Sequence, residues 1–465
     1  EMNDHSTKRT VLTIAVVSSF LVPFMGSSIN IALPTIGAEF KADAVLLGWV
    51  TASYLLVSAM LLLPFGRAGD IYGRKKVFLC GFIIYTIGSL LSAFSVSCFM
   101  LIICRVIQGI GSSMAFGTAM AILTSVFPPA ERGRAIGITV AAVYTGLSLG
   151  PFLGGFLTHN LGWRSIFYMN LPLGLIVIYL VLKRLKGEWA EAKGEPVDLK
   201  GSLLYALSLF LVMFGLSQFP STSGIVCVTV GAVGFVVFFL LEFRTASPVI
   251  DIRVFRHNPP FVFSNLAAMI HYSSTYAVSF MLSLYLQYIK GLSAQEAGMI
   301  LVSQPIIMAL FSPFSGWLSD RIEPRVIASI GLAFTCVPIY LLSFLGDQTG
   351  LTYIIANLLV LGFGFALFSS PNSNAVMSSV EKRYYGVASG TLGTMRVIGQ
   401  MLSMAVVMMV FSIIMGKVRI TPEHYPFLVR SEHIIFTING SLCFIAIFLS
   451  LARGRVRPGT GMPLP

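Results

Sequence analysis

Long apolar runs dominate this sequence and restrict it to the membrane. Of its 465 residues, 56% are hydrophobic and only 11% are charged, whereas a soluble globular protein carries about 25% charged residues. The few charges lie in short clusters between runs long enough to cross a bilayer, which takes about 20 helical residues. A membrane β-barrel would instead show alternating segments of about ten residues. The sequence therefore predicts an all-α polytopic membrane protein and argues against a soluble enzyme.

The apolar runs define the predicted spans. Bounded by charges or by Pro and Gly clusters, they number about fourteen. They cover residues 11–33, 46–65, 77–96, 98–127, 135–159, 163–182, 201–216, 224–242, 261–288, 292–318, 326–346, 351–371, 386–415 and 432–452.

The basic residues indicate the orientation. Most of the 31 Lys and Arg fall in segments that share one side of the membrane with the N-terminus. By the positive-inside bias, both termini are expected in the cytoplasm of a multi-pass plasma-membrane protein. The net charge of +12 then reflects topology and contact with anionic lipid. Nucleic acid is not an expected partner.

Signatures of cofactor chemistry are missing from the sequence. The six cysteines lie in or beside apolar spans without C-x-x-C spacing or a neighbouring acidic or His cluster. No nucleotide loop of the type G-x-x-x-x-G-K-[ST] occurs. We therefore expect no metal, no cofactor and no catalytic residues. A membrane-embedded enzyme would need such a cluster, and a channel a filter or ring of charges.

Two loops repeat one pattern. Gly66 precedes Asp70 by four residues and basic residues including Arg74 follow; Gly316 precedes Asp320 in the same way, about 250 residues later. Both loops fall on the cytoplasmic side, which predicts two parallel halves. The predicted organisation is an N-terminal six-helix bundle (11–182), cytoplasmic linkers with two inserted helices (183–260), a C-terminal six-helix bundle (261–452) and a cytoplasmic tail (453–465).

Several ordered motifs resemble one family. Residues 66–76 match G-x-x-x-D-x-x-G-R-[KR]-[KR], residues 105–111 read R-x-x-Q-G-x-G, and residues 146–155 read G-x-x-x-G-P-x-x-G-G. Residues 163–172, at the start of span 6, and residues 30–34, at the end of span 1, also resemble segments of that family. The chain resembles the major facilitator superfamily and, within it, the fourteen-span drug:proton antiporters. The resemblance implies two six-helix bundles of the major facilitator type plus two inserted helices, and an efflux protein that works by alternating access.

The repeated loops and the span 5 motif suggest gating residues. A carboxylate at a helix end favours a neighbouring helix dipole, so Asp70 and Asp320 are interpreted as a latch between the halves. Plain positive-inside anchoring would explain the basic residues but not the repeated spacing. The glycines of span 5 would let another helix approach closely, although such packing occurs in many membrane proteins. The expected gating residues are Gly66, Asp70, Arg74, Gly150, Pro151, Gly154, Gly316 and Asp320.

Ionisable residues inside spans suggest the substrate site, because a charge in the bilayer centre costs at least about 2.5 kcal/mol. Arg105, His271 and Arg396 are the strong cases, and none of the 19 acidic residues falls near a span centre. A structural arginine or an interhelical histidine hydrogen bond is the alternative interpretation. Related antiporters carry an Asp in span 1 where this chain has Met25, so His271 is the candidate for proton coupling. The expected substrate-binding residues are Met25, Asn30, Arg105, Gln108, Tyr144, His271, Gln304 and Arg396.

The sequence thus predicts a secondary active transporter, not an enzyme. Its expected role is multidrug-like export of small amphipathic compounds. The alternative is export of a specific anionic or zwitterionic metabolite, or of a lipid, with little or no proton coupling. The expected partners are the small-molecule substrate, membrane lipids and protons, and the expected state is a monomer.

Overall fold

The computed structural model describes residues 2–245, 248–249, 258–319, 321–381 and 385–454. Every regular element within these ranges is a helix, which confirms the predicted all-α class. Asp320 and residues 455–465 of the expected tail lie outside the described residues.

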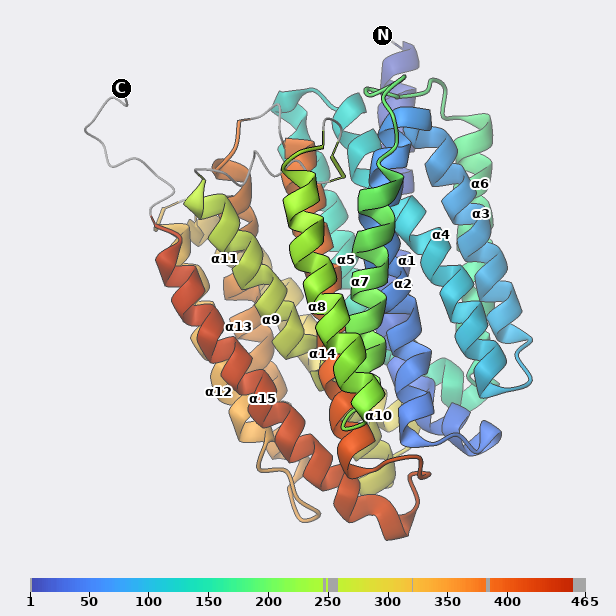
Figure 1. The fold of residues 1–465 in the computed structure, drawn as a ribbon, viewed down its shortest axis with the longest axis vertical. Coiled ribbons are helices and arrows are strands. Elements are labelled where there is room, and N and C mark those ends of the chain that lie inside the picture. Colours follow the sequence, from blue (N-terminus) through green and yellow to red (C-terminus); the bar gives the residue numbers. More distant parts are fainter. Residues whose placement is uncertain (1, 246–247, 250–257, 320, 382–384, 455–465) are drawn as a thin grey trace.

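Six helices form the N-terminal bundle, in which α1 packs against α5, α2 against α4, and α3 against α4 and α6 (Figure 1). They are α1 (Met2–Phe40), α2 (Ala44–Tyr72), α3 (Arg74–Ala93), α4 (Cys98–Val126), α5 (Pro129–Leu161) and α6 (Arg164–Lys183).

A second bundle follows an inserted helix pair. The pair is α7 (Leu199–Ser217) and α8 (Thr222–Glu242). The second bundle comprises α9 (Pro259–Leu284) with its π-helical extension η2 (Tyr285–Ile289), α10 (Ala294–Leu301) with α11 (Ser303–Ser319), α12 (Pro324–Leu342), α13 (Leu351–Ser378), α14 (Tyr385–Ile414) and α15 (Tyr425–Ala452), which a short 3₁₀ turn (Pro422–His424) precedes.

The spans agree with the sequence prediction. Among the described residues, thirteen helical segments are long and apolar enough to cross a membrane. Helix α9 is not one of the thirteen, although its 26 residues give it sufficient length. Its middle carries His271 and the hydroxyl residues 273–275, which lower its mean hydropathy. With α9, the described residues contain fourteen helical segments of membrane-spanning length, the number expected.

The helix starts follow ordinary capping chemistry. Asp43 accepts a hydrogen bond from the Leu46 amide at the start of α2 (2.7 Å), and Asn258 caps α9 through the Phe261 amide. Ser293 and Glu296 form a reciprocal capping box at α10. Because these caps satisfy free amides, the loops between helices can stay short.

Both described ends of the chain lie at one end of the molecule, which we call the terminal end. Helix α1 begins there and α15 finishes there (Figure 1). The opposite end, called the distal end, holds the α1–α2, α9–α10 and α14–α15 connections. Both bundles therefore run in parallel, as the repeated loops predict.

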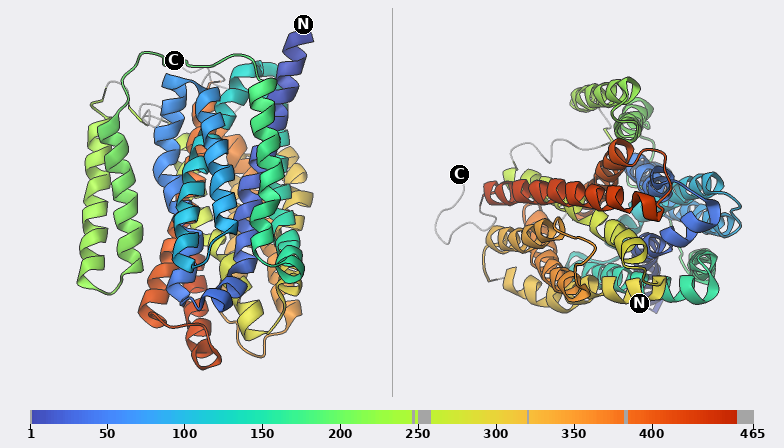
Figure 2. Two further views of the ribbon diagram at one scale, coloured as in Figure 1. Left: turned by 90° about the vertical axis from the view of Figure 1, so that its right-hand side faces the viewer. Right: turned by 90° about the horizontal axis from the view of Figure 1, so that it is seen from below.

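The inserted pair stands outside the two bundles (Figure 2). Helix α7 nevertheless contacts both of them, through α2 and α14. The Tyr205 hydroxyl donates to the Ala59 carbonyl of α2 (2.9 Å), and Ser412 of α14 donates to the Phe219 carbonyl in the α7–α8 loop (2.6 Å). On the outward faces, large side chains such as Leu203 and Leu207 are exposed, as lipid contact requires.

We expect the pair to lie outside the substrate path. Cysteines introduced one at a time at positions 203–214 should react with a lipid-soluble maleimide at rates that substrate does not change. A cysteine at Ser112, which faces the bundle interior, is the matched comparison. Substrate protection within 203–214 would contradict this expectation.

Candidate substrate site and gates

Arg105 of α4 is fully buried, and one of its guanidinium nitrogens makes no hydrogen bond within the described residues. Its Nη1 donates to Gln108 Oε1 (2.5 Å), and its Nε donates to the Val50 carbonyl (3.2 Å). The guanidinium carbon lies 4.2 Å from the ring centre of Tyr54. Its Nη2 has no hydrogen-bond partner among the described residues. A guanidinium has five N–H donors, so Arg105 can still bind an acceptor.

Aromatic and hydroxyl side chains surround this arginine. The Tyr54 hydroxyl donates to Ser112 Oγ (2.7 Å), and Tyr85 lies beside Gln108. We call Tyr54, Tyr85, Arg105, Gln108 and Ser112 the Arg105 group. Tyr276 of α9 approaches the group from the other bundle, with its hydroxyl next to Gly26 of α1. The group therefore faces the seam between the two bundles.

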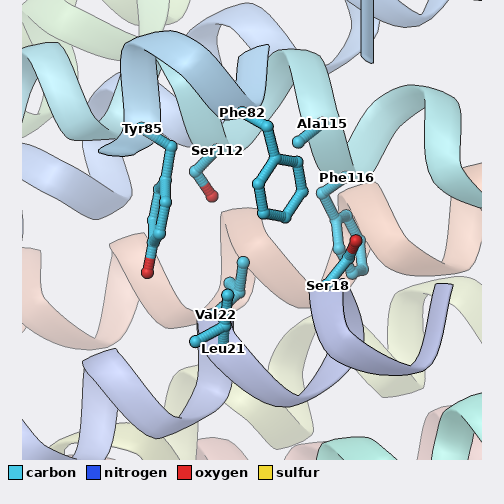
Figure 3. A pocket seen from close by; sticks show the side chains of 8 residues that line it. All are labelled: Ser18, Leu21, Val22, Phe82, Tyr85, Ser112, Ala115 and Phe116. Carbon is cyan, nitrogen blue, oxygen red and sulfur yellow. The ribbon is translucent and has the colours of Figure 1, made fainter. Parts of the chain in front are cut away.

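A small cavity adjoins the Arg105 group between α1, α3 and α4 (Figure 3). Tyr85 and Ser112 form part of its wall, together with Phe82 and Phe116. The enclosed space is about 10 Å³, which holds at most one water molecule. Drug-sized ligands need about 300 Å³ or more. In this packing the cavity is therefore too small for a drug-sized substrate.

Arg396 lies on the other side of the seam. Its guanidinium carbon is 5.3 Å from the ring centre of Phe116, which also lines the cavity. Tyr144 of α5 is nearby and its hydroxyl donates to Ser369 Oγ of α13 (2.7 Å), which joins the two bundles. Arg396 is the twelfth residue of α14 and Arg105 the eighth of α4. They lie roughly 16 and 10 Å from the first residues of their helices, and α14 begins at the terminal end whereas α4 begins at the distal end.

His271 is enclosed by aromatic rings inside the C-terminal bundle. Its ring centre is 4.2 Å from that of Phe368 and 4.6 Å from that of Phe365, and it is fully buried. Neither ring nitrogen has a hydrogen-bond partner in the described part of the chain. Phe365 also packs with Tyr144, so His271 lies one layer behind the seam.

The structure groups some expected substrate-binding residues and separates others. Arg105 lies with Gln108, and Tyr144 lies near Arg396. Met25 is buried inside the N-terminal bundle, where its sulfur accepts from Asn170 Nδ2 (2.8 Å). Gln304 is half-buried on α11, and its backbone carbonyl lies against Gly362.

Asn30 takes part in a seal at the distal end. Pro34 has no amide hydrogen, so it cannot donate to the Asn30 carbonyl four residues earlier. Ser283 Oγ of α9 donates to that carbonyl instead (2.6 Å), and Gln287 Nε2 donates to the Ile31 carbonyl (2.9 Å). The Asn30 side chain accepts from Thr51 within the N-terminal bundle (3.2 Å). The Asn30 carbonyl, which the proline leaves free, and the neighbouring Ile31 carbonyl thus join the two bundles.

The α5 motif, residues 146–155, packs against α1 on one face and against α10 on another. Added Cβ atoms at Gly150 and Gly154 would collide with Ser27 and Ser28 of α1, so these positions allow close packing within one bundle. On the other face, Gly155 lies against the Ala294 carbonyl of α10. The Pro151 carbonyl lies against Gly298, also of α10. The motif therefore also brings the two bundles together near the distal end.

The loop motif at the terminal end contacts the following linker. Arg74 pairs with Asp70 (2.7 Å) and Glu191 (2.8 Å), and its Nη1 donates to Ser125 Oγ (2.5 Å). The Ala192 amide donates to the Asp70 carbonyl (3.0 Å). In this packing Asp70 therefore binds the linker, and its role as a latch between the bundles stays a prediction.

Gly66 and Gly316, which begin the two repeated loops, differ in their surroundings. A Cβ at Gly66 would lie 3.8 Å from the Gly117 carbonyl of α4. A Cβ at Gly316 would meet no described atom within 4 Å. The close helix approach seen at the first loop is thus not repeated at the second.

One acidic residue lies deeper in its span than the sequence predicts. Glu432 was expected at the boundary of the last span, but α15 begins at Tyr425, so Glu432 is its eighth residue. It is fully buried, and neither carboxylate oxygen has a hydrogen-bond partner among the residues described. Pro426 at the start of α15 was the missed signal, because proline is favoured in the first turn of a helix.

Comparisons with known proteins agree with this architecture. The model of the Major Facilitator Superfamily matches residues 15–404 and again 264–463. The riboflavin transporter RibZ of Clostridioides difficile is 32% identical over 447 residues, which are 96% of this chain and 97% of RibZ. The multidrug resistance protein Stp of Mycobacterium tuberculosis is 31% identical over 384 residues, 81% of this chain and 71% of Stp.

A solved structure shares the fold. The crystal structure of peptide transporter POT in complex with alafosfalin superimposes with a TM-score of 0.71 at 14% sequence identity, covering 97% of this chain and 96% of POT. Together with the fourteen spans in two bundles, these matches show that the chain belongs to the major facilitator superfamily, a family of membrane transporters.

Proposed function

We propose that this protein is a secondary active transporter that exports small amphipathic compounds across the plasma membrane. The observation that carries the proposal is the Arg105 group, which faces the seam between the bundles and retains a free donor. Residues 11–182 and 261–452 are the moving bundles, residues 183–260 join them, and residues 453–465 form the tail. The terminal end faces the cytoplasm, as the basic residues indicate.

Alternating access requires packings of the bundles that differ by only a few kcal/mol. The bundles in this structure are joined at the distal end by Ser283, Gln287 and the α5–α10 contacts. We assign this packing to the state that is closed toward the outside. The Asp70 latch belongs to the opposite state, which is closed toward the cytoplasm.

The seam favours substrates with acceptor oxygens. Two arginines face it, and a guanidinium in a low-dielectric setting attracts anions and acceptor groups more strongly than in water. The surrounding aromatic side chains suit planar or amphipathic molecules. Relatives named for multidrug resistance support a broad specificity.

A second candidate is the transport of one specific metabolite. RibZ, which matches this chain over nearly all of both lengths, is named for a single heteroaromatic compound. The two buried arginines favour an anionic or zwitterionic metabolite in the same way. Proton coupling would then be weak, with His271 as a candidate because its imidazole lies one layer behind the seam.

Membrane lipids are the second expected partner. Arg9 and Arg184 line a hollow of about 320 Å³ between α1 and the end of α6, at the terminal end. Their charges suit lipid phosphates.

Direct binding of matched dyes tests the substrate class. An anionic dye should bind the purified protein at least tenfold more weakly after Arg396→Ala, because a charge-assisted hydrogen bond contributes about 1.5–3 kcal/mol. Arg419→Ala, in an exposed distal loop, is the matched control and should leave binding unchanged. Tight binding of a cationic dye that is indifferent to Arg396→Ala would contradict the proposal. Dye flux in proteoliposomes, with and without a pH gradient, then separates export coupled to protons from uncoupled transport.

A further inference from the structure

Glu432 is a buried acid that the substrate site does not use. Its side chain lies in α15, about 10 Å from the start of the helix, with both oxygens unpartnered in the described structure. An ionised carboxylate without a partner is costly in an apolar interior. The present packing therefore holds Glu432 as the neutral acid.

Tyr285 of η2 is an ionisable side chain near enough to Glu432 to interact with it electrostatically. Its hydroxyl donates to the Gly346 carbonyl (2.7 Å), which leaves the carboxyl group without a hydrogen bond from it. Lys290 lies beyond Tyr285, 5.8 Å above its ring, and donates to the Asp347 carbonyl (2.6 Å). The nearby lysine thus has a partner of its own.

The other elements packed against α15 add few titratable groups. From residue 397 to residue 414, α14 contains no ionisable side chain. In α12, Tyr340 is hydrogen-bonded to Ser441, further along α15. The remaining titratable groups on these elements are His271, Tyr272 and Tyr276 in α9, Tyr288 in η2, Arg325 and Cys336 in α12, Tyr385 and Arg396 in α14, Glu423 and His424 in the 3₁₀ turn, and Tyr425, Arg430, His433 and Cys443 in α15.

The α9–η2 segment connects Glu432 with the distal seal. Ser283 and Gln287 donate to carbonyls of α1, whereas Tyr285, between them in sequence, faces Glu432 of α15. The segment therefore contacts the seal on one face and the buried acid on another. The π-helical turn Tyr285–Ile289 continues α9 here, and such turns are rare and frequent at functional sites.

We propose that Glu432 is a proton-binding site that controls the distal gate. With the proton bound, α15 and η2 pack as seen here and Ser283 and Gln287 hold α1. When the proton leaves, the charged carboxylate must reach water, so α15 and η2 separate and the distal end opens. Under the proposed export function, on which this role rests, a proton taken up outside would return the protein to its outward-closed state.

Distance measurements between spin labels test the proposal without substrate. The labels occupy the exposed distal positions Lys41 and Gln348, one in each bundle, in a protein whose six cysteines are replaced. The distal distance should lengthen between pH 5 and pH 8.5 in the parent protein. In Glu432→Gln, which mimics the neutral acid, it should stay short at both pH values. Glu432→Asp, which keeps an ionisable group, should retain the pH response.

A further variant makes the result specific. Glu423→Gln, an exposed glutamate near the start of α15, should respond like the parent. A parent protein that shows no pH response, or a Glu432→Gln variant that keeps it, would overturn the proposal. The distance measurement contains no dye, so it can be interpreted even if the protein does not transport the dye. A failure of dye transport would then count only against the proposed export function.

Discussion

Replacing Arg105 by alanine is expected to reduce transport about a hundredfold or more. The variant loses a charged donor for the substrate, and it leaves the buried Val50 carbonyl and Gln108 Oε1 without their partner. Hydrogen bonds to charged groups contribute about 1.5–3 kcal/mol each, and 1.4 kcal/mol is a factor of ten. The measurement is initial-rate flux of the anionic dye in proteoliposomes that contain equal amounts of folded protein.

Arg105→Lys separates binding from folding in this experiment. Lysine keeps the positive charge but not the planar fork of donors, so transport should recover only in part. Dye affinity should follow the same order as flux if the group contacts substrate. Arg105→Ala transport within twofold of the parent, with unchanged dye affinity, would assign Arg105 to helix packing.

Replacing Gly155 by leucine is expected to hold the distal end open and lower turnover more than tenfold. A side chain at this position would meet the Ala294 backbone of α10, which cannot move away as a flexible side chain would. Overpacking typically costs about 1–3 kcal/mol, which is comparable with the energy difference between transporter states. The variant should therefore fold but favour the packing in which α5 and α10 are apart.

The spin labels at Lys41 and Gln348 report this change as a longer distal distance. Gly298→Leu should act in the same way, because Gly298 meets the Pro151 carbonyl across the same contact. Gly390→Leu is the control, since a Cβ there meets no described atom within 4 Å. An unaltered distal distance in Gly155→Leu would show that α5 and α10 do not limit opening.

The sequence predicts the spans because each must bury about 20 residues of apolar helix, whatever its neighbours are. The sequence predicts the ends of the spans less accurately than their number. The first span was expected to finish at residue 33, before Pro34, yet α1 continues to Phe40 because Ser283 satisfies the carbonyl that the proline leaves free. Such rescue depends on another helix, so the local sequence does not contain it.

The sequence predicts those parts of the candidate site whose residues lie close together on a single helix. Arg105 and Gln108 are three residues apart on α4, and this spacing places them on one face. Contacts between distant segments were not predictable in this way. The pairing of Arg74 with Glu191, and the burial of Glu432 against η2, depend on how helices far apart in sequence pack.

The carbonyl of Asn30 has a consequence for the gate that it helps to close. When α1 and α9 part, that carbonyl loses Ser283 and has no amide of its own helix to return to. A bare carbonyl is costly in a dry interior but inexpensive when it is hydrated. Opening of the distal end is thus tied to the entry of water, and the gate cannot open into lipid.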